Sequence, residues 1–99
     1  MRYISTRGGL EPSCFESILL GGLAPDGGLI VPESYPKCSK DCIESWRNLS
    51  YVELAFEILR LYATDWPESS LRALIDKSYT LMAFGSREIT PLKQLDEQL

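Results

Sequence analysis

Apolar residues recur at helical spacing in two long stretches of the chain, Leu49–Thr64 and Asp65–Tyr79. Positions three and four apart share one helix face, so each stretch would bury a single stripe. The stripes contain Leu54, Ile58, Leu61 and Tyr62 in the first stretch, and Leu71, Leu74, Ile75 and Tyr79 in the second. Ser50 and Glu53 have the spacing of a capping box, and Pro67 suits a first helical turn. The pattern predicts two amphipathic helices.

Two shorter helices are predicted nearer the N-terminus. In the stretch Ser13–Gly22, Ser13 and Glu16 again have capping-box spacing. The glycine pair that closes this stretch would end the helix, because glycine adopts the left-handed C-cap conformation without steric cost. The stretch Ser39–Trp46 predicts another short helix, with Ser39 as its N-cap.

The remaining segments are predicted to be extended or to form turns. Arg2–Thr6 and Leu29–Pro32 read as short strands, the second stopped by proline. Leu81–Ser86 would turn the chain, Ile89–Leu95 would be extended, and Asp96–Gln98 would form a hairpin tip. A last strand without a returning partner leaves an open sheet edge, which proteins normally cover. We therefore expect this chain to be the beginning of a longer one.

These elements predict one α+β domain over residues 1–99, small and mostly helical with a few short strands. The helices between Ser39 and Tyr79 should pack together, and the helix Phe15–Leu20 should lie against the strands. The expected core consists of Phe15, Leu19, Ile30, Leu54, Ile58, Leu61, Leu71, Ile75 and Tyr79.

Composition narrows the class of protein. A hydrophobic fraction of 44% with ten aromatic residues is typical of a folded chain. The net charge is −4 without a basic stripe, which argues against nucleic acid as a partner. We expect no secretory leader, because the start "MRYISTRG" has no apolar h-region, and no membrane helix, because no apolar run is long enough. The odd number of cysteines, three, suits a reducing compartment. We expect a soluble, cytoplasmic protein.

The chain offers little self-contained chemistry. It has no histidine, which removes the commonest general base and the commonest metal ligand. Cys14, Cys38 and Cys42 are interpreted as ordinary thiols, because a lone C-x3-C spacing is a weak zinc signal, and no metal site is expected. Lys93 is interpreted as surface charge, since nothing near it in the sequence would lower its pKa. Neither catalytic nor cofactor-binding residues are predicted.

The glycine-rich stretch Gly21–Pro32, "GGLAPDGGLIVP", matches neither a Walker loop nor the dinucleotide-binding pattern. Its simpler interpretation is a turn in which Asp26 bonds back to its own backbone. A direct ligand contact is the alternative. Arg7 lies beside two glycines at a predicted strand end, where its guanidinium could meet a phosphate or carboxylate, or could remain a solvated or structural arginine.

Taken in order, four segments of the sequence resemble the N-terminal domain of threonine synthase, in the branch found in many proteobacteria and in fungi. The segments are "RYISTRG", "SCFESILLGGLAPDGGLIVPESYP", "LSYVELAFEILRLYATDWPESSLRALIDKSY" and "ITPLKQL". The resemblance covers nearly the whole chain. The opening "STRG", the "GLAPDGGL" block and the closing "ITPL", in this order, make it specific.

The resemblance implies that the complete protein is a pyridoxal-phosphate-dependent lyase of threonine biosynthesis. It would convert O-phospho-L-homoserine and water to L-threonine and phosphate. In the family, the cofactor-binding lysine and the phosphate-binding loop lie beyond this domain, so they have no counterpart here and Lys93 is not a substitute. The chain alone is expected to bind no cofactor, to be inactive, and to dock on the catalytic domain of the same polypeptide.

The resemblance also gives a set of residues expected to face that catalytic domain and its substrate. They are Ser5, Thr6, Arg7, Asp26, Gly27 and Gly28. The main alternative is an independent binding or regulatory module that shares this domain but has no enzyme activity. A stand-alone serine or cysteine hydrolase is a weaker alternative, because the chain has no histidine to act as base.

Overall fold

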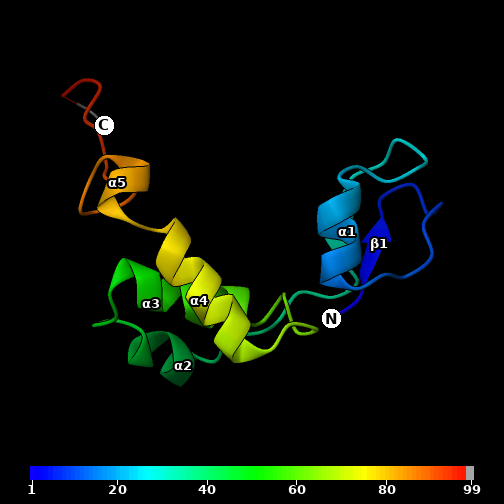
Figure 1. The fold of residues 1–99 in the computed structure, drawn as a ribbon, viewed down its shortest axis with the longest axis horizontal. Helices are drawn as coiled ribbons and strands as arrows, with labels where there is room; N and C mark the ends of the chain where they lie inside the picture. The colour runs from blue at the N-terminus through cyan, green and yellow to red at the C-terminus, as the bar shows by residue number, and fades with distance from the viewer. Residues whose placement is uncertain (98–99) are drawn as a thin grey trace.

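Two short strands and five helices form the fold in the computed structural model, which describes residues 1–97 (Figure 1). Their order is β1 (Tyr3–Ser5), α1 (Phe15–Gly21), β2 (Ile30–Pro32), α2 (Lys40–Ser45), α3 (Tyr51–Leu59), α4 (Glu68–Ser78) and α5 (Leu81–Phe84). The predicted class, a small and mostly helical α+β domain with a few short strands, is confirmed.

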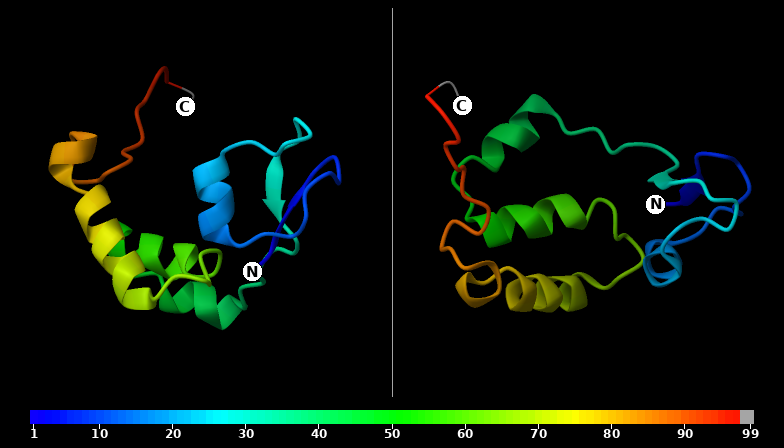
Figure 2. Two further views of the ribbon diagram at one scale, coloured as in Figure 1. Left: turned by 45° about the vertical axis from the view of Figure 1, so that its right-hand side comes forward. Right: turned by 90° about the horizontal axis from the view of Figure 1, so that it is seen from above.

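The elements form two lobes, which Figure 2 shows from two further directions. The strand lobe, residues 1–32, holds β1, α1 and β2, whereas the helical lobe, residues 40–84, holds α2 to α5. In the helical lobe α3 packs along α4, as expected for the two stripes. Among residues 1–97, no helix has both the length and the apolar character needed to cross a lipid bilayer.

The two strands pair antiparallel, with Tyr3 opposite Pro32, Ile4 opposite Val31 and Ser5 opposite Ile30. The side chains of Tyr3 and Ser5 are buried, while Ile4 between them is only half-buried. This alternation follows from the two-residue period of a strand. Tyr3 also forms a bridge to Ser13, which brings the start of α1 against the sheet, as predicted.

The capping of α1 differs from the prediction. Ser13 does not cap the helix, because its hydroxyl donates to the carbonyl oxygen of Glu11 at 2.8 Å. Instead, the carboxylate of Asp65 accepts from the amides of Phe15 and Glu16, each at 3.2 Å. The capping-box prediction at Ser13 and Glu16 is therefore wrong, because a residue fifty positions away satisfies the same amides.

The other helix ends are closer to the predictions. Ser39 caps α2, and Ser50 with Glu53 forms the predicted capping box of α3. The pair Gly21-Gly22 ends α1, and Gly22 has a φ of 74°. Helix α3 ends at Leu59 rather than Thr64, because the amides of Leu61 and Tyr62 bond three residues back, to Ile58 and Leu59, and tighten the chain into turns.

The C-terminal part of the chain departs furthest from the prediction. The predicted turn at Leu81–Ser86 contains the one-turn helix α5, capped by the Thr80 side chain and ended by Gly85 at a φ of 75°. Residues 91–95 form neither helix nor strand, so the extended segment pairs with no strand. Of the predicted hairpin tip, Gln98 lies outside the described residues.

The main core lies in the helical lobe around Phe56, Ala63, Leu71 and Ile75. Phe15 of α1 and Tyr79 pack against it while remaining partly exposed, and Ile30, Leu54 and Leu61 are half-buried. Two of the expected core residues are wrong, since Leu19 is 56% exposed and Ile58 is 40% exposed. Ile58 lies on the predicted stripe of α3, and Leu74, on the predicted stripe of α4, is likewise 46% exposed, so neither stripe is buried over its whole length.

Candidate functional site

The carboxylate of Asp26 is the centre of a hydrogen-bonded cluster in the strand lobe. It accepts from the Ser5 hydroxyl at 2.8 Å, from the Gly28 amide at 2.8 Å and from the Gly9 amide at 2.6 Å. The bond to Gly28 is the predicted turn, in which the aspartate side chain reaches two residues along its own backbone. One side chain thus joins the turn at residues 26–28 to the chain that leaves β1.

Thr6 and Arg7 complete this cluster, which we call the Asp26 loop cluster. The Thr6 hydroxyl accepts from the Leu29 amide at 3.0 Å. The Arg7 amide donates to the Ser5 hydroxyl at 3.1 Å, and Nη1 of its guanidinium donates to the Asp26 carbonyl oxygen at 3.0 Å. The structure therefore brings the predicted residues together, although they come from two segments about twenty positions apart.

Glycine is required at this cluster by close packing. A methyl group on Gly28 would touch the Ser5 hydroxyl and would lie 2.9 Å from the nearer Asp26 carboxylate oxygen. A methyl group on Gly9 would lie 2.6 Å from the other carboxylate oxygen. Gly27 has a φ of 79°, a backbone conformation that disfavours other residues. The glycines thus let two backbone segments approach one carboxylate.

The electrostatics of the cluster favour the charged form of Asp26. The hydrogen bond from the Gly28 amide, followed by that from the Ser5 hydroxyl, holds the pKa of Asp26 below its ordinary value. Ser5 is buried, whereas Arg7 is exposed. The Asp26 carboxylate therefore has a structural role, in which it joins the two loop segments through hydrogen bonds. The guanidinium of Arg7 is the group in the cluster that can contact an external anion.

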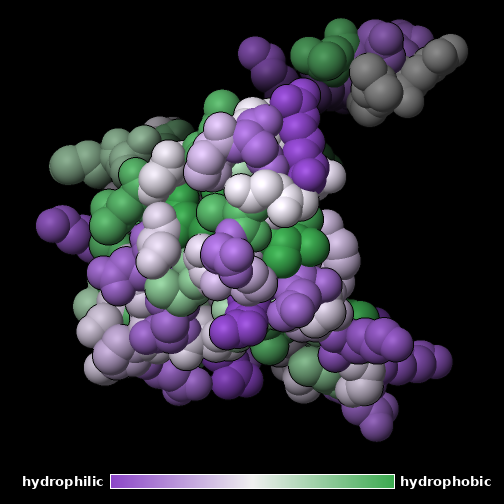
Figure 3. All heavy atoms as spheres, turned by 90° about the vertical axis from the view of Figure 1, so that its right-hand side faces the viewer, coloured by the Kyte–Doolittle hydropathy of each residue, from purple (hydrophilic) through white to green (hydrophobic). Residues whose placement is uncertain are grey.

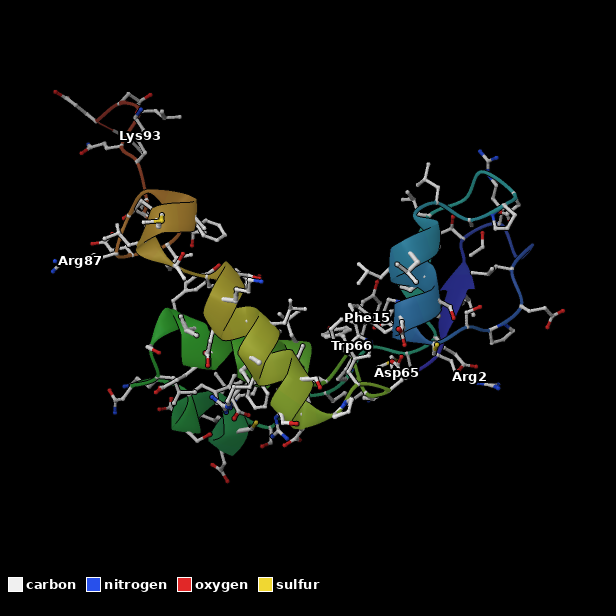
Figure 4. All side chains as sticks on the ribbon, in the orientation of Figure 1. Arg2, Phe15, Asp65, Trp66, Arg87 and Lys93 are labelled. Carbon is white, nitrogen blue, oxygen red and sulfur yellow. The ribbon has the colours of Figure 1, made fainter. Side chains whose placement is uncertain are left out.

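The other residues considered from sequence lie apart from this cluster. Lys93 is on the C-terminal tail, at the opposite end of the molecule (Figure 4). Cys14 precedes α1 and is exposed, whereas Cys38 precedes α2 and Cys42 lies in its first turn, so Cys14 is in a different part of the fold from the other two thiols. Among the described residues, no group of three or more histidine, cysteine, aspartate or glutamate side chains is placed to hold a metal ion.

Sequence reasoning missed a second set of contacts, in which residues 62–65 fasten the strand lobe to the helical lobe. The Tyr3 hydroxyl donates to the Tyr62 carbonyl oxygen at 2.7 Å, and the Met1 amino group donates to the Thr64 hydroxyl at 2.6 Å. Asp65 caps α1 beside them, and Figure 4 shows it next to Phe15 and Trp66. We call these contacts the lobe clasp.

The lobe clasp also has an aromatic part and a charged part. The Phe15 ring meets Trp66 edge-on and Tyr3 at a tilt, with centroids 6.0 Å apart in each pair. Burial raises the pKa of Asp65, but hydrogen bonds from the Glu16, Asp65 and Phe15 amides outweigh it and leave the pKa lowered. No local sequence signal marks Asp65 as a cap for a helix fifty residues away.

Comparison with known proteins identifies the family. Residues 2–79 match the model described as threonine synthase N terminus. The chain is 42% identical to a threonine synthase of Methylobacillus glycogenes and 41% identical to a threonine synthase-like 2 protein of Xenopus laevis, in each case over its whole length. It covers only 22% and 21% of those proteins, so the chain spans about a fifth of the curated relatives that it matches.

A solved structure agrees with this assignment. The crystal structure of pyridoxal-phosphate-bound threonine synthase from Brucella melitensis superposes with a TM-score of 0.84 at 35% identity. The match covers 98% of this chain and 21% of the crystallised one. Because the family model spans most of the sequence and the fold agrees over nearly all of it, this chain belongs to the threonine synthase N-terminal family.

Proposed function

We propose that this chain is the N-terminal, non-catalytic domain of a threonine synthase. The complete enzyme would be a cytoplasmic, pyridoxal-phosphate-dependent lyase that converts O-phospho-L-homoserine and water to L-threonine and phosphate. The observation that carries the proposal is the alignment of the whole chain with about a fifth of a threonine synthase, at 42% identity. The remaining four fifths of such a relative have no counterpart here and would supply the catalytic domain.

The residues of this chain do not fit pyridoxal phosphate, which needs a sheltered lysine and a cradle for its phosphate group. All four lysines, Lys37, Lys40, Lys77 and Lys93, are exposed on the described surface. The described residues also contain no histidine. The amides of Gly9 and Gly28, which could otherwise bind a phosphate, already donate to the Asp26 carboxylate. Within the proposal, the cofactor would therefore bind to the catalytic domain.

Within this proposal, the Asp26 loop cluster faces the catalytic domain and its substrate. Asp26, Ser5 and the surrounding amides would fix the two loop segments, and Thr6 with Gly27 and Gly28 would shape their outer surface. Arg7 would direct its remaining guanidinium donors to the phosphate of O-phospho-L-homoserine. Support comes from the geometry, because the one side chain in the cluster with a positive charge is exposed while the negative charge is satisfied internally.

Steady-state kinetics of the complete polypeptide would test this role. Arg7→Ala is compared with Arg2→Ala, which removes another exposed arginine from the same lobe. Phosphate release from O-phospho-L-homoserine is measured over a range of substrate concentrations. We expect kcat/KM to fall at least tenfold for Arg7→Ala, in line with about 1.5–3 kcal/mol for a hydrogen bond to a charged group. An unchanged kcat/KM would remove the direct role.

The wider proposal is tested by comparing two lengths of the protein. The complete polypeptide should release phosphate, form threonine and show the absorbance of bound pyridoxal phosphate. The chain of residues 1–99 should do none of these under the same conditions. Phosphate release by the short chain, or none by the complete polypeptide, would contradict the assignment.

A further inference from the structure

An apolar hollow of about 290 Å³ lies at the junction of the two lobes. Phe15 and Leu19 of α1 form one wall, Leu74 of α4 forms another, and Phe84 of α5 closes one end. Leu19, Leu74 and Phe84 remain 56%, 46% and 45% exposed. The hollow is thus an open surface between the lobes, lined by residues that an amphipathic pattern would normally bury.

The molecule as a whole is too open for its size. Its radius of gyration is 16.4 Å, whereas a compact domain of about 100 residues has roughly 13 Å. Its accessible surface is 7728 Å², against about 5,700 Å² expected from area scaling of a compact protein of this mass. The open arrangement thus leaves roughly 2,000 Å² more surface accessible than a compact domain of this mass would.

Part of the excess surface is apolar, chiefly around the hollow. Figure 3 shows hydrophobic side chains at the surface of the face that carries α1 and β1, between hydrophilic ones. Residues 91–97, the C-terminal tail, are exposed throughout, including the side chains of Leu92 and Leu95. Large apolar side chains exposed together around one hollow are typical of a site of protein association.

The lining of the hollow favours protein side chains over a small molecule. No charged side chain lines it among the residues that the structure describes. The Ser78 hydroxyl at its edge already donates to the Leu74 carbonyl oxygen at 2.7 Å, and the Tyr79 ring stacks on Phe84 with centroids 5.4 Å apart. Small-molecule sites usually combine apolar walls with a few placed polar groups, which are lacking here.

From these observations we propose that the hollow seats an apolar segment of the catalytic domain in the same polypeptide. The proposal rests on the proposed function, because that domain is the part of a threonine synthase that this chain lacks. Relatives carry about four fifths of their length beyond the matched part, enough to cover an area of this size in cis. Such a segment would contact α1 and α4 together, so it would fix the strand lobe, and with it the Asp26 loop cluster, against the helical lobe.

Site-specific photocrosslinking in the complete polypeptide would test the proposal. A photoreactive p-benzoylphenylalanine replaces Phe84 in one variant and Leu74 in another, both at the hollow. The control variant carries it in place of Ile43, a 55% exposed residue of α2 that does not line the hollow. After irradiation, mass spectrometry identifies the crosslinked peptides, and melting curves check that each variant is folded. Because Phe84→p-benzoylphenylalanine replaces one aromatic side chain with another, this variant should still fold. It therefore keeps the test valid if the Leu74 variant does not fold.

We expect intrachain crosslinks from positions 84 and 74 to peptides beyond residue 99. These products should be absent from the Ile43 variant. Crosslinks only between two chains would assign the hollow to a second copy and overturn the proposal. Crosslinks only within residues 1–97, or no more product than in the control, would overturn it as well. Phosphate release from O-phospho-L-homoserine is measured separately on the unmodified polypeptide, so its absence would count against the proposed function and not against the docking site.

Discussion

At the scale of single residues, one carboxylate organises the candidate site. Asp26 receives three hydrogen bonds from two segments that are distant in the sequence, and these bonds lower its pKa. A charged acceptor satisfied by backbone amides and a hydroxyl is stronger than a neutral one. The same contacts hold the Asp26 carboxylate within the cluster, and the exposed guanidinium of Arg7 is the positive charge on its outer side.

The close packing at Gly28 gives a prediction for a single methyl group. Gly28→Ala would press Cβ against Ser5, Thr6 and Asp26, so the cluster must open to admit it. Overpacking of this kind typically costs about 1–3 kcal/mol of unfolding free energy, measured here by urea denaturation of the chain. The control Gly21→Ala adds a methyl group where no neighbouring atom lies within 4 Å. Equal stability of the two variants would contradict the packing argument.

Acid should weaken the Asp26 loop cluster. Because the folded-state pKa of Asp26 is lowered, its ionised form stabilises the folded loop, and this contribution is complete above the ordinary carboxyl pKa of about 4. It is lost as the pH falls through the lowered folded-state value. Below pH 4 we therefore expect the protection factor of the Gly9 amide against hydrogen exchange, corrected for intrinsic rates, to be lower than above pH 4. Asp26→Asn should remove this pH dependence, whereas Asp76→Asn, on exposed α4 surface, should retain it.

At the scale of elements, some helices are capped by adjacent residues and one is capped by a distant residue. Helices α2 and α3 carry their own caps, so their beginnings can be predicted from a few adjacent residues. Helix α1 is capped by Asp65 from the loop between α3 and α4. That bond makes the start of α1 depend on the helical lobe, and it joins an element boundary to the arrangement of the whole chain.

The capping of α1 gives the second stability prediction. Asp65→Ala removes the acceptor for the Phe15 and Glu16 amides and should destabilise the chain by about 1 kcal/mol, as for other lost N-caps. Ser13→Ala removes the residue that local spacing identified as the cap, and should cost less because its hydroxyl bonds elsewhere. Thermal unfolding monitored by circular dichroism compares the two variants. A larger loss of stability for Ser13→Ala than for Asp65→Ala would instead support the capping box of Ser13 and Glu16.

The same contrast explains how much of the structure the sequence could reveal. Ser39, Ser50 and the Gly21-Gly22 pair act through neighbours within a few residues, so their roles were predictable. The turn at Asp26 was predictable for the same reason, but its bonds to Ser5 and Gly9 depend on strand pairing. Asp65 was missed because its partners are fifty residues away, and Leu19 was wrongly assigned to the core because a stripe does not show what covers it.

At the scale of the whole molecule, the chain forms two lobes and leaves apolar surface between them. The lobe clasp at residues 62–65 holds the lobes at one side of this junction, with Phe15 and Trp66 packed beside it. The hollow lies where α1, α4 and α5 approach one another and remains open. The domain therefore has a defined internal arrangement but does not bury all the apolar surface that its helices carry.

Dye binding should detect this open surface in solution. The chain of residues 1–99 is expected to enhance the fluorescence of the apolar dye ANS, and the complete polypeptide should do so much less, since the catalytic domain would cover the hollow. Replacing two hollow residues, in the double variant Leu74→Gln and Phe84→Gln, should lower the signal of the short chain, whereas Ile43→Gln on α2 should leave it unchanged. Molten states also bind ANS, but they lose the near-ultraviolet dichroism of packed aromatic side chains, so retention of that signal from Phe15 and Trp66 separates the two cases. If the chain of residues 1–99 does not enhance ANS fluorescence, the apolar surface between the lobes is not open to solvent, and the prediction is contradicted.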